Sequence, residues 1–203
     1  MIKEINEFKR STIFNHYHQG NNPFIILTTK IDVTKVVNYC KEYKNFYSTM
    51  GYLLTKTANE VDAFKYRYHN EKIYYCDNLH SCYTEIKNSD EIGFFRVEFD
   101  NNYKNYIQRY LNIKKDFLEN IDVPETNGLD NIWLSCSPWF NFSSLIPPFN
   151  KEVTIPQFIW DKYQKDNEKY YVNLMIMVHH GFADGYHVGQ FLEKLKQNIV
   201  KFK

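Results

Sequence analysis

Residues 169–195 read KYYVNLMIMVHHGFADGYHVGQFLEKL, and this stretch decides the fold. The apolar and β-branched run at 170–180 predicts a strand. Side chains alternate between the two faces of a strand. One face carries Val172, Leu174, Ile176, Val178 and His180, and the other carries Asn173, Met175, Met177 and His179. The two histidines therefore point in opposite directions and cannot bind one metal ion together.

The residues after this strand predict a turn and a closing helix. The helix has one apolar stripe, formed by Val188, Phe191, Leu192, Leu195 and Ile199. Asp184 precedes the helix, where it can cap the free N–H groups and accept a salt bridge. His180 follows an apolar row, where desolvation favours the neutral imidazole that a general base needs. A histidine at a strand end and an Asp-Gly turn also occur as purely structural features.

The sequence before this stretch predicts further strands and helices. Strands are expected at 23–33, 72–77, 81–87, 91–99, 131–142 and 156–164. Helices are expected at 35–43, at about 49–61 and at 102–119. The strands between 72 and 99 indicate an antiparallel meander. Because helices and strands do not alternate regularly, we predict a single α+β (mixed α/β) domain over residues 1–203, with a large, mostly antiparallel sheet flanked by helices.

The composition is that of a globular protein rich in aromatic residues. Of 203 residues, 43% are hydrophobic, 24% are charged and 18% are aromatic. Aromatic residues are enriched at pockets and subunit interfaces, so an oligomer is compatible with this content. Codon usage in an AT-rich genome would explain it equally well. The net charge of +1 argues against a nucleic-acid partner.

Three further features bear on location and metal binding. The chain has no run of about 18 apolar residues, which argues against a membrane span. The first residues, MIKEINEFKR, are charged and lack the apolar core of a signal peptide, so we expect a cytoplasmic protein. The cysteines at 40, 76, 82 and 136 are scattered, so we expect buried thiols and no metal site.

The segment HHGFADGYHVG at 179–189 also resembles a family signature. HHxxxDG followed by such a helix is similar to the active-site motif of chloramphenicol acetyltransferases. The shorter HHxxxDG also occurs in condensation domains and dihydrolipoamide acyltransferase cores. Four other segments resemble the chloramphenicol acetyltransferases in the family's order. They are R-x-x-x-F-x-x-Y from Arg10 to Tyr17, LTTKIDVT at 27–34, SCSPWFNF at 135–142, and 162–180.

The resemblance implies an O-acetyltransferase that moves acetyl from acetyl-CoA to a hydroxyl of chloramphenicol or a related small molecule. Acetyl-CoA would be a co-substrate, with no bound cofactor. By the same resemblance, His180 would be the general base in a ternary complex and Ser135 would donate to the oxyanion. Arg10 and Asp184 would form an ion pair that orients His180. From the residues alone, Arg10 reads equally well as a surface charge and Ser135 as an ordinary strand residue.

The resemblance also implies how acetyl-CoA binds and how copies assemble. Tyr47 and Tyr163 would sandwich the adenine, and Trp139 would lie near the pantetheine arm. Both tyrosines read equally well as core or interface aromatics. The family pattern is a homotrimer with its active sites at subunit interfaces. The histidine would come from one chain and much of the acceptor pocket from its neighbour.

The acceptor side departs from the family pattern. The acceptor pocket is expected to include Tyr17, Trp133 and Ile159. Ile159 stands where the family usually has a threonine that helps hold a water, and Trp133 stands where some members have asparagine. GNNPF at 20–24 replaces an apolar set, and Ala183 replaces a cysteine. We therefore predict normal binding of acetyl-CoA but slow acetylation of chloramphenicol.

Two other functions stay open at the level of sequence. One is a homologue that binds CoA or another ligand with little turnover. The presence of the predicted catalytic residues argues against it; these are His180, Ser135, Asp184 and Arg10. The other is an acyltransferase with a larger, carrier-bound donor. That function needs a docking partner, since 203 residues leave no room for a carrier domain in the same chain.

Overall fold

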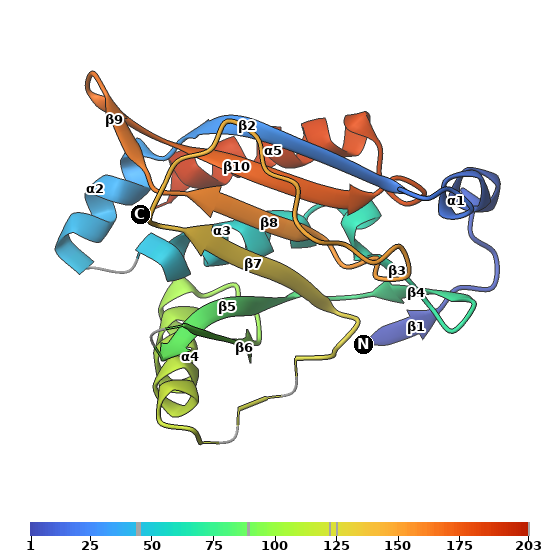
Figure 1. The fold of residues 1–203 in the computed structure, drawn as a ribbon, viewed down its shortest axis with the longest axis horizontal. Coiled ribbons are helices and arrows are strands. Elements are labelled where there is room, and N and C mark those ends of the chain that lie inside the picture. The colour runs from blue at the N-terminus through green and yellow to red at the C-terminus, as the bar shows by residue number, and fades with distance from the viewer. Residues whose placement is uncertain (44–45, 89, 122, 125, 203) are drawn as a thin grey trace.

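The structure is a computed structural model that describes residues 1–43, 46–88, 90–121, 123–124 and 126–202. Its helices are α1 (Ser11–His18), α2 (Thr34–Tyr43), α3 (Phe46–Asn59), α4 (Tyr103–Leu118) and α5 (Gly185–Lys201), with a 3₁₀ turn, η1, at Asp62–Lys65. Its strands are β1 (Ile2–Glu4), β2 (Phe24–Asp32), β3 (Tyr66–His69), β4 (Lys72–Cys76), β5 (His80–Asn88), β6 (Glu91–Val97), β7 (Asn131–Ser137), β8 (Gln157–Asp161), β9 (Gln164–Asp166) and β10 (Lys169–His179). Figure 1 shows their arrangement.

One large sheet organises the molecule. Its strand order is β2-β10-β8-β7-β5-β6, and β9 also pairs with β10. The pairs β7–β8 and β5–β7 are parallel, whereas the other pairs are antiparallel. A second, small sheet has the order β1-β4-β3. The prediction of an α+β fold on a large, mostly antiparallel sheet flanked by helices is confirmed.

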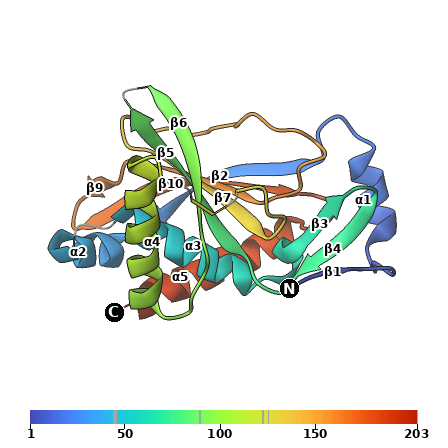
Figure 2. The same ribbon diagram turned by 90° about the horizontal axis from the view of Figure 1, so that it is seen from below.

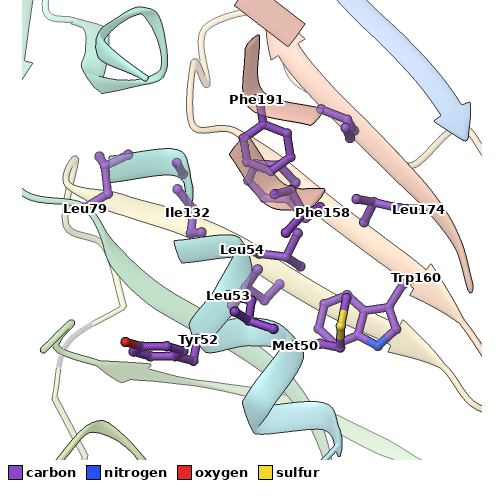
Figure 3. Packing of buried hydrophobic residues seen from close by; sticks show 14 of the residues in the cluster. Met50, Tyr52, Leu53, Leu54, Leu79, Ile132, Phe158, Trp160, Leu174 and Phe191 are labelled. Atoms are coloured by element: carbon purple, nitrogen blue, oxygen red, sulfur yellow. The ribbon is translucent and has the colours of Figure 1, made fainter. Parts of the chain in front are cut away.

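Helices cover one face of the large sheet, which we call the inner face. In Figure 3, Leu53 and Leu54 of α3 point toward Phe158 of β8, beside Phe191 of α5. The apolar row predicted for the 170–180 strand is part of this cluster, through Val172, Leu174, Ile176 and Val178. Burial of apolar surface on this scale, at about 25 cal/mol per Å², is the main term that stabilises the fold.

The opposite face, which we call the outer face, is covered by extended chain. The 138–156 segment crosses it, on the side of the sheet away from α3 and α5 (Figure 2). A small cluster of Phe24, Met175 and Met177 packs there against Phe142 and Leu145 of that segment. Large apolar side chains of the segment and of β6 stay exposed. They are Ile92, Phe94, Trp139, Phe140, Ile146 and Phe149.

The predicted meander between 72 and 99 is wrong in one part. β5 and β6 form the expected antiparallel pair, but β4 pairs with β1 and β3 in the small sheet. The side chain of Asn59, at the end of α3, accepts from the Leu79 N–H at 2.7 Å and donates to the Leu79 carbonyl at 2.9 Å. This pair of bonds anchors the connection between β4 and β5 to α3, so the two strands belong to different sheets.

Most other predicted elements are present with shifted ends. The strand predicted over 131–142 ends at Ser137, because Pro138 has no N–H to donate to the ladder. The strand predicted over 156–164 ends at Asp161, so Tyr163 lies outside it. Helix α1 had no counterpart among the predicted elements. Its only buried residue is Phe14, and so short an apolar stripe gives little periodicity to detect.

Candidate active site

His180 lies just beyond strand β10, which ends at His179. Its backbone N–H donates to the Pro23 carbonyl at 2.7 Å, so the turn is tied to the chain that leads into β2. Its imidazole stacks on the Tyr17 ring of α1, with 3.8 Å between ring centroids and 8° between the ring planes. The Nδ1 atom of His180 is buried and has no hydrogen-bond partner among the residues that the structure describes. Tyr17 thus holds the plane of the imidazole.

His179 is the more deeply buried of the two histidines. It packs edge-on against Phe24, and its Nδ1 accepts from the Gly181 N–H at 3.1 Å. Burial, followed by the nearby His18 and His180, lowers the pKa of His179 to about 3. We expected burial at His180 from its place after an apolar row. The structure buries His179 more deeply, because the chain turns after β10 and leaves His180 half-buried.

Asp184 connects the two segments that flank His180 in space. Its Oδ2 lies 3.0 Å from Nη1 of Arg10, so the predicted ion pair is present. Asp184 also caps α5 by accepting from the N–H groups of Tyr186 and His187, and its own N–H donates to the His187 ring. Burial alone would raise the pKa of Asp184, but the bonds from Arg10 and His187 outweigh it and lower the pKa to about 2. The carboxylate is therefore ionised at neutral pH.

Ser135 lies on β7, where two hollows meet. The first is lined in part by Tyr47 of α3 and Lys114 of α4, and the second lies on the outer face. Ser135 and Thr84 of the neighbouring strand β5 line both hollows. The parallel pairing of β5 and β7 extends to Tyr83 opposite Leu134, which is the residue pair immediately before Thr84 and Ser135. Both hydroxyl residues therefore stand at the end of the shared ladder, where the space between the strands is open on both sides.

The first hollow, of about 320 Å³, brings together two of the residues predicted to contact acetyl-CoA. Trp139 lines it and is 68% exposed. Tyr47 lines it too, but the Tyr47 hydroxyl donates to the Thr84 carbonyl at 2.7 Å and more weakly to the Leu134 carbonyl at 3.4 Å. Burial raises the pKa of Tyr47 far above its usual range. Tyr47 therefore offers its ring, and not its hydroxyl, to this hollow.

The second hollow, of about 280 Å³, lies on the other side of Ser135. Its walls include Trp133 and Ile159, which were both predicted to line the acceptor pocket. Pro147 and Pro148 of the 138–156 segment also line it. This hollow is therefore a small, largely apolar space between the outer face of the sheet and the chain that crosses it.

Tyr163 lies near the start of α3. It packs edge-on against Phe46, the residue before Tyr47, and against Tyr170, with 5.0 and 5.8 Å between ring centroids. It lines a different hollow from Tyr47. The adenine contact of the two tyrosines stays a prediction.

Ser135 and His180 lie far apart within one chain. Ser135 is opposite Ile159, and Ile159 is opposite Met175. His180 lies five residues beyond Met175, which corresponds to about 17 Å along the strand, and two strand spacings add about 10 Å across the sheet. A proton transfer needs heavy atoms about 3 Å apart. His180 and Ser135 of the same chain cannot act on one reacting group.

Outside the gaps at 44–45, 89, 122, 125 and 203, no three His, Cys, Asp or Glu side chains are grouped so that they could hold a metal ion. Within the same ranges, every helix is too short or too polar to span a bilayer.

Sequence reasoning missed several residues of the hollows. Among them are Thr84, which lies beside Ser135 in both hollows, and Gln157 and Phe94 in the second hollow. Gln157 had a usable signal, because it stands two residues before Ile159 and so faces the same side of β8. Thr84 had none, because only the parallel pairing of β5 with β7 brings it beside Ser135.

Comparison with known proteins identifies a family. The family model described as chloramphenicol acetyltransferase matches residues 1–196. The chain is 29% identical to a chloramphenicol acetyltransferase of Campylobacter coli, over 98% of this chain and 97% of that protein. It is 27% identical to one of Clostridium butyricum, over 98% of this chain and 94% of that protein.

Solved structures share the fold. A chloramphenicol acetyltransferase superposes with a TM-score of 0.86 at 19% identity, covering 98% of this chain and 100% of that one. A probable dihydrolipoamide acetyltransferase from Listeria monocytogenes has a TM-score of 0.73 at 16% identity, covering 99% of this chain and 95% of that one. The structures establish the fold and the match over residues 1–196 establishes the family. The chain belongs to the chloramphenicol acetyltransferase family, whose members are acetyl-CoA-dependent acetyltransferases.

Proposed function

We propose that this protein transfers the acetyl group of acetyl-CoA to a hydroxyl of a small molecule, chloramphenicol or a related alcohol. One observation carries the proposal: two separate hollows meet at Ser135. A direct transfer needs a donor and an acceptor that approach one point from two sides. The first hollow, with Tyr47 and Trp139, suits the pantetheine arm of the donor, and the second hollow suits the acceptor.

The proposed reaction is a direct attack in a ternary complex. The imidazole of His180 removes the proton of the acceptor hydroxyl, and the oxygen attacks the carbonyl carbon of the thioester. The resulting oxyanion accepts a hydrogen bond from the Ser135 hydroxyl, a type of contact that contributes about 3 kcal/mol. The tetrahedral intermediate then breaks its carbon–sulfur bond, and His180 returns the proton to the CoA sulfur. The products are the acetyl ester and CoA.

Arg10 and Asp184 act in this proposal as positioning residues. Asp184 binds Arg10 just before α1 and also caps α5, while Tyr17 of α1 stacks on His180. These contacts join α1, the turn at 180–184 and α5. Loss of the ion pair would therefore loosen the imidazole without removing the base itself.

The proposal requires more than one copy of the chain. Within one chain, His180 lies about 17 Å along the sheet from the level of Ser135, too far to share a substrate. We therefore assign the base and the oxyanion donor of each active site to different copies. The family pattern implies three copies in a closed ring, and such a ring would form three equivalent sites.

The exposed apolar side chains support a subunit contact on the outer face. Ile92 and Trp139 line the first hollow and Phe94 lines the second, yet each of these side chains is more than half exposed in the single chain. Monomeric proteins rarely expose so many large apolar groups around one site. A neighbouring copy seated there would bury them and could bring its His180 to Ser135.

The test of the proposed function is release of free thiol from acetyl-CoA. We expect release that depends on both the protein and an added alcohol, with one ester formed for each thiol. Thiol release with no alcohol dependence would indicate hydrolysis. A third result would be that the protein binds acetyl-CoA but releases no thiol, either with chloramphenicol or with any of a panel of other alcohols. That result would indicate a homologue that only binds its ligand, and it would contradict the proposal.

A further inference from the structure

We propose that Gln157 is a specificity-determining residue, whose side-chain amide binds a polar group of the acceptor in the second hollow. The inference rests on the proposed function, because it takes this hollow as the acceptor pocket. It adds the class of acceptor, which is a small alcohol with a flat, apolar body and one further hydrogen-bonding group.

The side chain of Gln157 lies in the wall of the second hollow. Gln157 as a whole is only 7% exposed. Among the described residues, no hydrogen bond joins its side-chain amide to the protein. An amide carries one acceptor and two donor hydrogens. At the wall of a largely apolar hollow, these groups are open to a ligand that can pair with them.

The surroundings of Gln157 are mostly apolar. Trp133 lies opposite Gln157 in the parallel ladder, and Phe94 and Ile159 are apolar. Pro147 and Pro148, in the chain that crosses the hollow, have no backbone N–H. The hydroxyl residues of the same hollow are Thr84 and Ser135, and no described hydrogen bond joins either of them to Gln157. The donors and the acceptor of the Gln157 amide are therefore available to a molecule in the hollow.

The position of Gln157 limits the shape of the acceptor. Ser135 is opposite Ile159, and Gln157 lies two residues before Ile159 on the same face of β8. The Cα atoms of Ser135 and Gln157 are therefore about 8 Å apart. A reacting hydroxyl near Ser135 and a polar group near Gln157 would be separated by roughly the width of one aromatic ring, which Trp133 and Ile159 could flank.

Two matched alcohols test the inference. 4-(Hydroxymethyl)benzamide carries a primary amide across the ring from its hydroxyl, and 4-isopropylbenzyl alcohol has an apolar group of similar shape in the same place. Calorimetric titration in the presence of CoA gives the affinity without turnover. We expect the native protein to bind the benzamide at least about tenfold more tightly, the range expected for one good hydrogen bond. In Gln157→Leu this preference should vanish, because the benzamide binds more weakly.

Turnover of the same two alcohols with acetyl-CoA separates this inference from the proposed function. If the native protein binds the benzamide more tightly but acetylates neither alcohol, the role of Gln157 is supported and the proposed function is contradicted. Turnover with equal affinities, or an equal preference in the native protein and in Gln157→Leu, would overturn the role of Gln157. So would failure of both alcohols to bind at millimolar concentration.

Thermal unfolding provides a control on folding. Gln157→Leu and Gln157→Met should unfold at the same or a higher temperature than the native protein, because neither removes a hydrogen bond within the protein and each keeps a similar volume. A clear fall in Tm in both variants would show that the amide has a partner within the protein, which would also contradict the inference.

Discussion

The two faces of the large sheet differ in how some of their buried polar side chains are hydrogen-bonded. On the inner face, the hydroxyls of Thr55, Ser81, Tyr106 and Tyr83 form a chain of hydrogen bonds of 2.6–2.7 Å. On the outer face, the Ser137 hydroxyl is buried without a partner in the described chain, and the side chain of Gln157 lines the second hollow. The indole N–H of Trp160 is an exception on the inner side, because it too lacks a partner among the described residues.

This difference separates what stabilises the protein from what we propose acts on substrates. The inner face is filled by one large cluster that includes side chains of α3 and α5, whereas the outer face has a cluster of three buried residues and the second hollow. The first hollow lies at the end of the ladder between β5 and β7 and is lined from both faces. Substitutions on the inner face should therefore act mainly on stability. Substitutions of the outer face and of the turn that bears His180 should act mainly on turnover.

The largest effect is expected at the two histidines. His180→Ala should lower kcat by about a thousandfold or more, because it removes the general base, while the affinity for CoA stays the same. His179→Ala should mainly lower stability, since His179 packs on Phe24 and Phe14. Steady-state kinetics and CoA titration of both variants make the comparison. The reverse pattern would assign the base to His179.

A smaller loss is expected from Ser135→Ala. Removing one oxyanion donor should lower kcat by about a hundredfold or more, with little change in Tm. Ser137→Ala is a matched control, because Ser137 stands two residues further on the same face of β7 and its hydroxyl has no partner in the described chain. Equal losses in the two variants would mean that Ser135 has no special place in the reaction.

The acceptor pocket should limit the reaction with chloramphenicol. We predict a kcat/KM for chloramphenicol well below about 10⁶ M⁻¹s⁻¹, because Ile159 cannot hold the water that a threonine would. Ile159→Thr should raise it by about tenfold or more, an effect of 1–3 kcal/mol. Ile159→Val, which removes one methylene without adding a hydroxyl, should not. A native kcat/KM at or above that value would show that the departures on the acceptor side have no consequence.

The smallest effect is expected at the ion pair. The side chains of Arg10 and Asp184 are 26% and 34% exposed, so solvent screens them, and Asp184→Asn should cost about 1 kcal/mol. Tm should fall by about 2–4 °C, and kcat should fall several-fold through a less well oriented His180. Asp166→Asn is the control, because its pair with Lys30 is more than half exposed on both sides. Native Tm and full activity in Asp184→Asn would contradict the positioning role.

The same ion pair predicts a dependence of stability on pH. The pKa of Asp184 is lowered in the folded state to about 2, from an ordinary value of 3.8. Its contribution is therefore complete above about pH 4 and is lost as the pH falls toward 2. The difference in Tm between the native protein and Asp184→Asn should shrink over this interval. A difference that stays constant from pH 6 to pH 2 would exclude this carboxylate as its source.

The strands and helices with a strong apolar pattern could be predicted from the sequence. Val172, Leu174, Ile176 and Val178 alternate as one face of β10, and this face is buried as expected. The partners of the strands could not be predicted in the same way. β4 joins the small sheet through a hairpin with β3 and through pairing with β1, which lies at the distant N-terminal end of the chain, and neither β1 nor β3 was among the predicted strands. Pairing between distant segments leaves no periodic signal in either one.

The candidate site was predictable where the family resemblance names the partners, and not where contacts depend on strand register. The ion pair between Arg10 and Asp184 is present as expected. The shared position of Thr84 and Ser135 between two hollows depends on the parallel ladder of β5 and β7, which no single segment reveals. The distance between Ser135 and His180 follows from two successive strand pairings for the same reason.

The central claim is that each active site takes His180 from one copy and Ser135 from another. Unfolded His180→Ala and Ser135→Ala chains, each nearly inactive alone, would be mixed in equal amounts, refolded together and assayed for thiol release from acetyl-CoA with the best acceptor. If copies exchange at random in a closed ring, about one site in four receives both native residues, so about a quarter of native activity should return. The activity of native chains that are refolded in the same way defines full activity. A mixture no more active than the two variants alone, beside an active native control, would contradict the claim.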